Sequence, residues 1–350
     1  MSLEAQNAGA GEVRLAVDIG ALAAWMEETI PDFSGSLAVC QFKGGQSNPT
    51  YLLTAPGRKY VLRRKPPGKT VPGAHAVDRE ARVIGALGRD GFPVPHIFGL
   101  CMDDTVLGAP FYVMEHVEGR VFWSAQFDSV PVAERPLYFD AMADTLASLH
   151  GRNPEALGLS NFGKHGNYFE RQLARWTRQY RSDGDVAGSN ADMDALAELL
   201  PTLVPTEDES RIIHGDYRAD NMIFHPTEPR VIAVLDWELS TLGHPLADFA
   251  NHLMMYHLPT TILSGLSGVN LAAQNLPTEE DYVARYCGTA GRYSLGNIDF
   301  LLAFSMYRLA AIYHGIKARA LRGNASSAHA LELASRYGDI AQLARHQLGG

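Results

Sequence analysis

Two short apolar segments, each with polar residues at an edge of an apolar run, constrain this sequence more than any other feature. The first covers residues 212–224 and contains His-Gly-Asp-Tyr-Arg-Ala-Asp-Asn at positions 214–221, followed by an apolar tripeptide. The second covers residues 231–235 and ends at Asp236. Short apolar runs separated by a polar turn are typical of buried β-hairpins. We therefore predict a hairpin whose edges present polar side chains to a cleft.

The polar residues of these segments suit phosphoryl transfer. That reaction needs a carboxylate to orient the attacking hydroxyl and accept its proton, oxygen ligands for Mg²⁺, and a cation for the transferring group. We assign Asp216 as the base, Asn221 and Asp236 as metal ligands, and Arg218 as a partner of the γ-phosphate. His-x-Asp-x-x-x-x-Asn alone is a weak pattern, because His-Gly-Asp is commonly a polar turn. The second aspartate, at the end of its own apolar run, favours the catalytic interpretation.

These residues resemble the catalytic core of the aminoglycoside phosphotransferase and choline kinase superfamily, whose members are relatives of the protein kinases. Residues 44–51, 60–66 and 225–245 resemble one branch in particular. In that branch the phosphotransferase domain is found alone in bacteria and fused to acyl-CoA dehydrogenase domains elsewhere. The resemblance covers roughly residues 20–320, and the motifs follow the family's order.

The fold class that we predict is α+β, in the form of a two-lobed protein-kinase-like fold. Apolar alternation and turn residues predict strands over 36–42, 50–54, 59–64, 96–102 and 111–116, with a helix over 78–87. Long helical patterns dominate after residue 120. We expect a small antiparallel β-sheet lobe over residues 1–117, with a loose N-terminal arm over 1–16, and a larger, mainly helical lobe over 118–350.

The resemblance implies a nucleotide site in the first lobe. The turn between its first two strands would cover the phosphates, with Gly44 and Gly45 allowing close backbone approach and Ser47 and Asn48 donating hydrogen bonds. A simple hairpin turn remains the alternative for this loop. It matches neither a Walker A sequence nor G-x-G-x-x-G.

The third predicted strand should carry a cation that contacts the phosphates and pairs with a glutamate on the next helix. Strand alternation puts Val61 and Arg63 on one face, so Val61 would pack on the base and Arg63 would reach the phosphates, with Glu80 as its partner. Arginine stands where lysine is usual, although it is also a permanent cation. An exposed, charged strand end remains the alternative.

Two further positions are expected to serve the nucleotide and the catalytic loop. The connector at Glu115, His116 and Val117 would meet the purine through its backbone, with ATP and GTP both open. Asp248 resembles the family's buried aspartate that braces the catalytic loop. A plain carboxylate near a helix N-terminus remains its alternative.

The acceptor is expected to be a small hydroxylated molecule. Only twelve positions separate Asp236 from Asp248, which is too short for a protein kinase's activation segment and peptide platform. The branch resemblance suggests a hydroxylated acyl or hydroxyacyl-CoA-like metabolite as the substrate. Mg²⁺ and ATP or GTP are the expected cofactor and co-substrate.

Composition narrows the partners and the compartment. A formal net charge of −9 argues against nucleic acid or an anionic membrane as a partner. No apolar run is long enough to cross a bilayer, and the N-terminus lacks a signal-peptide pattern. Three cysteines without metal-type spacing fit a reducing compartment, so the cytoplasm is expected. A monomer and a homodimer both remain open.

Three alternative functions remain. The first is a nucleotide-binding pseudokinase or regulatory module, although its catalytic positions are all filled here. The second is a metal-dependent hydrolase with His214, Asp216, His225 and Asp236 as ligands, which would leave Asn221 and the glycine-rich turn without a role. The third is a kinase of a quaternary amine, which would need an aromatic and acidic cage.

Overall fold

The computed structural model describes residues 10, 11, 13, 15–42, 48–66, 75–323 and 328–349. They belong to two compact units that interleave along the chain. The first unit comprises residues 1–122, 155–162 and 219–240, and the second comprises 123–154, 163–218 and 241–350. Two short later segments thus pack with the N-terminal part of the chain.

An antiparallel sheet forms the first unit, with strand order β1-β2-β3-β4-β6-β5. Its register places Arg63 of β4 opposite Thr50 of β3 on one side and opposite Tyr112 of β6 on the other. The strands are β1 (Ala10–Gly11), β2 (Ala38–Phe42), β3 (Thr50–Ala55), β4 (Arg58–Arg64), β5 (Ile97–Cys101) and β6 (Phe111–Glu115).

Helix α2 (Ile19–Thr29) belongs to the apolar core of this unit. The Asp18 side chain accepts a hydrogen bond from the Ala21 amide at the start of the helix, which satisfies one of the unpaired donors there. Leu22 and Met26, four residues apart on one helix face, are fully buried. They pack in one cluster with residues of the sheet, namely Tyr51, Leu53, Tyr60, Leu62, Phe111 and Val113.

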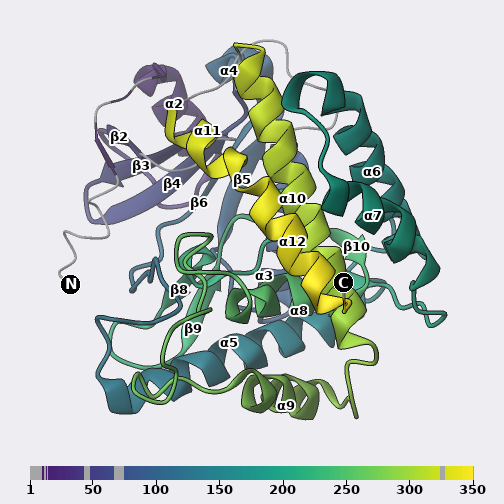
Figure 1. The fold of residues 1–350 in the computed structure, drawn as a ribbon. Helices are drawn as coiled ribbons and strands as arrows, with labels where there is room; N and C mark the ends of the chain where they lie inside the picture. The colour runs from purple at the N-terminus through teal and green to yellow at the C-terminus, as the bar shows by residue number, and fades with distance from the viewer. Residues whose placement is uncertain are drawn as a thin grey trace. The chain divides into compact units, whose positions relative to one another are not determined.

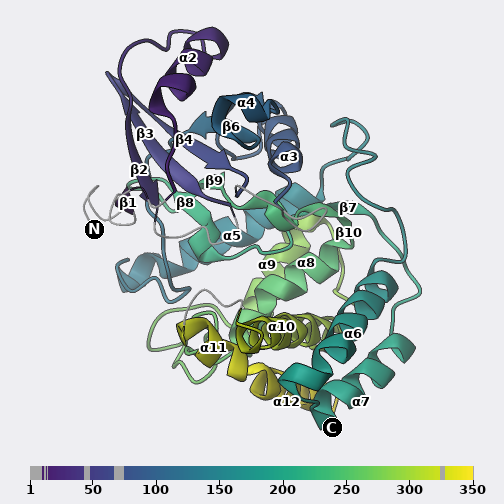
Figure 2. The same ribbon diagram turned by 90° about the horizontal axis from the view of Figure 1, so that it is seen from above.

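The other elements of the first unit lie around α3 (Val77–Arg89), which packs against β5 and β6 (Figure 2). A short helix, α4 (Asp104–Leu107), follows β5. The hairpin of β8 (Met222–Phe224) and β9 (Val231–Val234) also belongs here, flanked by the 3₁₀ turns η3 (Ala219–Asn221) and η4 (Trp237–Leu239). An isolated bridge between Arg120 and Phe224 joins the hairpin to the chain segment after β6.

The second unit is mainly helical, and α10 (Ile298–Leu321) is its central element. Figure 1 shows α10 and α12 side by side, with α6 next to α10. A two-stranded sheet of β7 (Arg211–Ile213) and β10 (Thr241–Gly243) precedes α8. The remaining elements are α5 (Arg135–His150), α6 (Tyr168–Ala187), α7 (Ala191–Leu199), α8 (Pro245–Leu253), α9 (Glu279–Ala290), α11 (Ala328–Ser335) and α12 (Tyr337–Gln347), with the 3₁₀ turns η1 (Val132–Glu134), η2 (Leu200–Thr202) and η5 (Met254–Tyr256).

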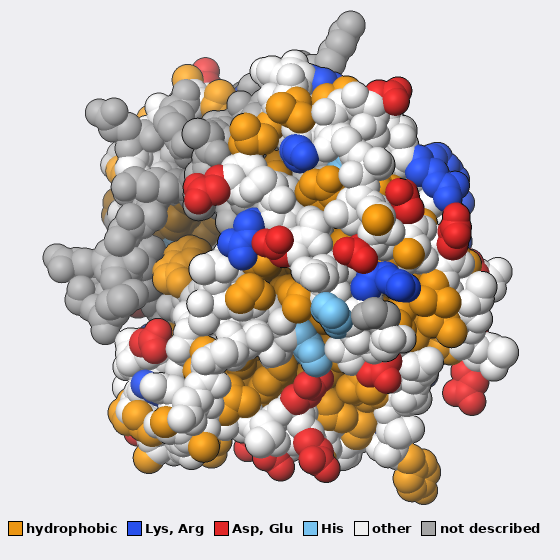
Figure 3. Space-filling view, viewed as in Figure 1, with side chains coloured by type: hydrophobic (Ala, Val, Ile, Leu, Met, Phe, Trp, Pro, Cys, Tyr) orange, Lys and Arg blue, Asp and Glu red, His pale blue; other side chains and the backbone are white. Residues whose placement is uncertain are grey.

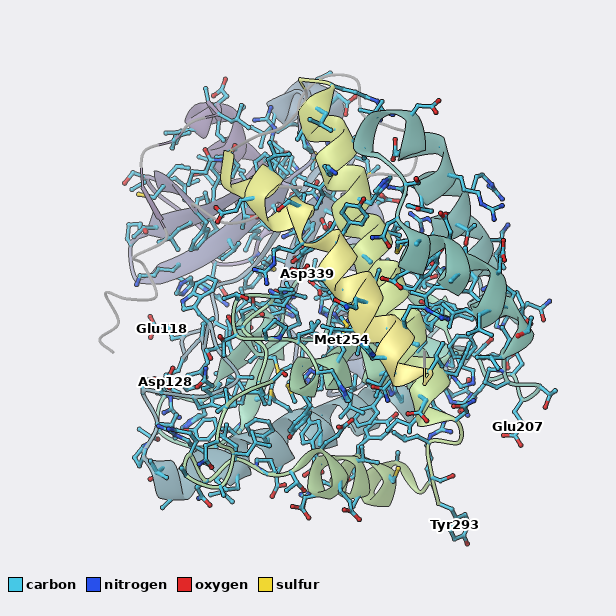
Figure 4. The ribbon with its side chains drawn as sticks, viewed as in Figure 1. Glu118, Asp128, Glu207, Met254, Tyr293 and Asp339 are labelled. Atoms are coloured by element: carbon cyan, nitrogen blue, oxygen red, sulfur yellow. The ribbon has the colours of Figure 1, made fainter. Side chains whose placement is uncertain are left out.

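Burial in α10 follows from its central position. Apolar residues surround most of the helix, as expected for an element packed against several others. Helix α6 carries four arginines, although the chain as a whole is acidic, and Figure 3 shows basic side chains on the surface where α6 lies. At the far end of the unit, Tyr293 follows α9 and points into solvent (Figure 4).

The predicted α+β fold class is confirmed: one unit is built on an antiparallel sheet and the other is mainly helical. Within the described ranges, no helix combines the length and the hydropathy that a membrane span requires.

Candidate active site

A buried cluster of charges lies at the end of β4. Arg63 places its Nε 2.7 Å from Glu80 Oε2 and its Nη2 2.7 Å from Asp236 Oδ1, with Glu238 Oε2 3.4 Å from the same Nη2. The predicted pair between Arg63 and Glu80 is therefore confirmed. Arg63 and Arg64 are both buried, so the exposed strand end considered as an alternative is wrong.

Glu80 is held from three directions. Besides Arg63, it accepts hydrogen bonds from the Tyr112 hydroxyl at 3.1 Å and from the Asn48 amide at 2.7 Å. Burial raises the pKa of Glu80, and Arg63 and these two donors only partly oppose this effect. Burial alone would lower the pKa of Arg63, but the surrounding carboxylates and Tyr112 raise it, so the guanidinium stays charged. The Asn48 amide that we expected at the phosphates is here bonded to Glu80.

The two candidate metal ligands lie at the same end of the β8–β9 hairpin. Asn221 directly precedes β8, and its backbone oxygen accepts a 2.8 Å hydrogen bond from the Leu235 amide, next to Asp236. Asp236 has φ 62° and ψ 63°, a left-handed conformation that is costly for a residue other than glycine. Strain of this kind is concentrated at functional sites. Both side chains carry the hard oxygen donors that Mg²⁺ prefers, so the residues present fit this ion.

A cavity of about 200 Å³ lies beside this charge cluster. It is lined by Val61, two residues before Arg63, and by Leu235, one residue before Asp236. Predicted residues Glu115 and Val117 also line it, as does His116 between them, whose pKa is lowered by burial and by Lys59. The remaining wall is mostly apolar and consists of Phe42, Thr50, Pro95, Gly119, Val121 and Ile223.

The catalytic loop belongs to the second unit and is braced by Asp248 of α8. Asp248 is fully buried, and its carboxylate accepts hydrogen bonds from the backbone amides of His214 at 2.7 Å and Gly215 at 2.8 Å. His150 of α5 lies 3.2 Å from the same carboxylate. Burial would raise the pKa of Asp248, but His150 and the His214 contacts lower it, so Asp248 stays charged. The bracing role inferred from the resemblance is confirmed as a contact.

Asp216 follows a glycine with φ 86°, a conformation that disfavours any other residue at position 215. Asp216 is half-buried, and its Oδ1 lies 3.9 Å from Nε of Arg218. Tyr313 of α10 lies near both side chains. Burial raises the pKa of Tyr313, Arg218 lowers it and Asp216 raises it. The meeting of Asp216 with Asn221 and Asp236, which belong to the other unit, stays a prediction.

Several contacts around these residues could not be read from the sequence. Tyr112, His150 and Arg308 all contact a predicted site residue or the loop that carries it, but none of them belongs to a motif. Glu238, which contacts Arg63, lies in a motif without having been assigned a role. Only Glu238 could have been suspected from the sequence, because it lies two residues after the predicted metal ligand Asp236. Gly44, Gly45 and Ser47 lie outside the described residues.

The hydrolase alternative would require a cluster of metal ligands. Within the described part of the chain, no group of three or more His, Cys, Asp and Glu side chains is placed to hold a metal ion. That alternative therefore gains no support from these residues.

A sheet unit that carries the Arg63–Glu80–Asp236 cluster and a helical unit that carries a braced His-Gly-Asp loop are the parts of a protein-kinase-like fold. Residues 38–285 match the model of the phosphotransferase enzyme family, and the chain belongs to that family.

Relatives and solved structures agree with this assignment. The chain is 42% identical to acyl-CoA dehydrogenase family member 11 of Gallus gallus over 348 residues, which cover 95% of this chain and 44% of that protein. It spans less than half the length of the curated relatives it matches. A Ralstonia eutropha structure, provisionally described as an aminoglycoside phosphotransferase, has a TM-score of 0.87 and 44% identity, with 95% of this chain and 99% of that one covered.

A more distant structure shares the fold. Spectinomycin phosphotransferase, solved with ADP and spectinomycin, has a TM-score of 0.62 at 10% identity and covers 96% of this chain and 99% of its own.

Proposed function

We propose that this protein transfers the γ-phosphate of ATP or GTP to the hydroxyl of a small hydroxyacyl or hydroxyacyl-CoA-type metabolite. The observation that carries the proposal is the contact of Arg63 with both Glu80 and Asp236 beside the cavity. A cation tied to a helix glutamate and to an aspartate at the end of a hairpin is the arrangement that positions phosphates in protein-kinase-like enzymes.

The cavity would take the purine, with Val61 on one face and the backbone of residues 115–117 at the edge. Its apolar walls suit a planar base, and its few polar groups suit recognition of that base's edge. The ADP in the spectinomycin phosphotransferase structure supports a nucleotide co-substrate for the family. Gly44, Gly45 and Ser47 would complete the phosphate contacts, while Asn48 holds Glu80 in place beside them.

Mg²⁺ would be held by Asn221 and Asp236 and would supply positive charge to the phosphates when bound. The charge cluster supports this assignment, because three carboxylates face one guanidinium and leave an excess of two formal negative charges. Asp216 would orient the acceptor hydroxyl and take its proton, and Arg218 would offset charge on the transferring phosphoryl group.

The proposed class of acceptor, an anionic acyl compound, rests on the positive charge near Asp216. Arg218 lies 3.9 Å from Asp216, so one cation is beside the proposed base. Burial raises the pKa of Tyr313, and both Arg218 and Arg336 lower it. Arg336 itself donates to Asp339 of α12, which is labelled in Figure 4. Arginines complement the phosphates or carboxylate of an anionic acceptor better than a cationic amine. The relatives named as acyl-CoA dehydrogenases point to acyl chemistry.

The compartment is part of this proposal. The cytoplasm supplies ATP and keeps thiols reduced, and the three cysteines of the chain are free. Neither nucleic acid nor a membrane is proposed as a partner. The proposed site uses residues of one chain only, so it is compatible with a monomer and with a homodimer.

The proposal is tested by turnover of MgATP and MgGTP over a panel of amino alcohols, sugars and hydroxyacyl-CoAs that differ in hydroxyl position. We expect phosphorylated product with a hydroxyacyl-CoA and a loss of about 10²–10⁴ in kcat for Asp216→Asn, since general-base catalysis contributes about that factor. Thermal stabilisation of Asp216→Asn by MgATP should persist. If the variant turns over as fast as wild type, Asp216 is not the base.

The panel also separates this proposal from its alternatives. Stabilisation by nucleotide without phosphorylation of any acceptor would indicate a pseudokinase or regulatory module. If only amino alcohols are phosphorylated, the acceptor is a quaternary amine or a related amino alcohol, and the proposed acyl acceptor is wrong.

A further inference from the structure

We propose that Arg308 is a positioning residue for phosphoryl transfer: it fixes the peptide bond that precedes Asp216 and thereby the direction of the catalytic carboxylate. The inference rests on the proposed role of Asp216 as the base. Arg308 lies on α10, 92 residues beyond Asp216, and belongs to no sequence motif.

The guanidinium of Arg308 joins two elements. Its Nη2 donates to the backbone oxygen of Gly215 at 2.9 Å, and its Nη1 donates to Oδ1 of Asn251 on α8 at 2.8 Å. The second contact anchors the fork, so the first is directed at the loop. Hydrogen bonds from a charged donor are about twice as strong as neutral ones, and Arg308 is only partly exposed.

Gly215 is consequently held at both of its polar backbone groups. Its amide donates to Asp248 Oδ1 at 2.8 Å, and its oxygen accepts from Arg308. That oxygen belongs to the same planar peptide unit as the Asp216 amide, which donates to His214 Nδ1 at 3.2 Å. Without Arg308, this peptide unit would keep only the longer contact to His214, and it could rotate more freely about Gly215, whose φ is 86°.

The contact of Arg308 with Gly215 affects how precisely the Asp216 carboxylate is positioned. A catalytic group displaced by about 1 Å costs about 10²-fold in rate. Asp248 fixes the loop on the side of His214, and Arg308 fixes it on the side of Asp216. Lysine cannot replace Arg308 fully, because one ammonium lacks the planar fork that reaches both acceptors at once.

The test compares Arg308→Ala and Arg308→Lys with wild type in steady-state MgATP turnover, with water and with the hydroxyacyl-CoA panel as acceptors. We expect kcat to fall about 10–100-fold in Arg308→Ala and less in Arg308→Lys, with KM for MgATP changed less than about threefold. Methylguanidinium should restore part of the lost kcat in Arg308→Ala. The matched control is Arg319→Ala, an exposed arginine on the same helix, for which no change is expected.

A double-mutant cycle separates positioning from a merely structural role. If Arg308 acts through Asp216, its substitution should have little further effect on the residual turnover of Asp216→Asn. Equal fold-losses in both backgrounds would overturn the proposal, as would wild-type kcat in Arg308→Ala. If Arg308→Ala does not fold, wild-type kcat in Arg308→Lys overturns it instead.

Failure of the proposed kinase activity would give a different result from failure of the Arg308 proposal alone. Wild-type protein that is stabilised by MgATP but transfers phosphate to neither water nor any probe would overturn both proposals. Active wild type with an unaffected Arg308→Ala would overturn this one alone.

Discussion

A single arginine determines the electrostatics of the nucleotide side. Arg63 stands where lysine is usual in the family, and the structure gives a physical reason why arginine is accommodated. Its Nε contacts Glu80 while its Nη2 contacts Asp236, so one planar fork serves two carboxylates from different elements. A lysine ammonium would have to reach both from one point. Almost complete burial of Glu80 makes the pairing essential, because an unpaired buried carboxylate is costly.

Replacing Arg63 alone should therefore destabilise the protein more than replacing Arg63 and Glu80 together. We expect Arg63→Met to lower the free energy of unfolding by about 3–5 kcal/mol, the usual penalty for leaving a buried charge unpaired. Adding Glu80→Gln should recover part of this loss, since the neutral amide can keep the contacts to Tyr112 and Asn48. Urea denaturation of the two variants measures both effects. A double variant no more stable than Arg63→Met would contradict the explanation.

At the scale of elements, strands and helices with strong periodicity were predictable and close approaches between them were not. The apolar runs at 222–224 and 231–235 correspond to β8 and β9, and the predicted strands of the sheet lie within two residues of their observed ends. The contact of the hairpin with residues 119–120 carries no local signal. It depends on Gly119, where a Cβ atom would lie 2.3 Å from the Phe224 oxygen and 2.4 Å from the Ile223 side chain.

Gly119 is thus a packing requirement of the cavity wall. We expect Gly119→Ala to destabilise the protein by about 1–3 kcal/mol, the usual cost of overpacking, because the nearest obstacle is backbone. Displacement of Ile223, which also lines the cavity, should weaken ATP binding about tenfold or more. Calorimetric titration with MgATP and thermal melting report the two effects. Gly184→Ala on α6 is the control, since its Cβ meets no atom within 4 Å; equal behaviour of the two variants would refute the steric argument.

At the scale of the whole molecule, the sequence indicates which residues are candidates for the site but not which distant residues support them. The spacing of Asp216, Asn221 and Asp236 is local enough to form a motif, and the pair of Arg63 and Glu80 follows from strand and helix order. Arg308 contacts Gly215 across 93 residues of chain, and such contacts arise only when distant helices pack together. No periodicity or composition rule can name that partner, because each arginine of a helix looks alike until the fold is known.

The pH dependence of the folded state is another property of the whole molecule. Burial lowers the pKa of His244 and of His252 to about 4, although Asp248 partly opposes this effect at His252. An unfolded histidine titrates near pH 6.5. Between these values the unfolded chain binds protons that the folded chain does not, so the free energy of unfolding falls as the pH falls. The stabilisation is complete above pH 6.5, and each histidine accounts for at most about 3 kcal/mol over the window.

Replacing one of the two histidines should remove its share of this slope. His252 lies between the Tyr217 oxygen, 2.9 Å from Nδ1, and the Tyr282 hydroxyl, 2.6 Å from Nε2. A glutamine can make both hydrogen bonds but does not titrate, so His252→Gln should be less sensitive to pH between about 6.5 and 4. Denaturant curves at several pH values measure the slope, with the exposed His346→Gln as the control that should match wild type. An unchanged slope in His252→Gln would show that folding leaves the pKa of His252 where it is in the unfolded chain, which would contradict the lowered pKa.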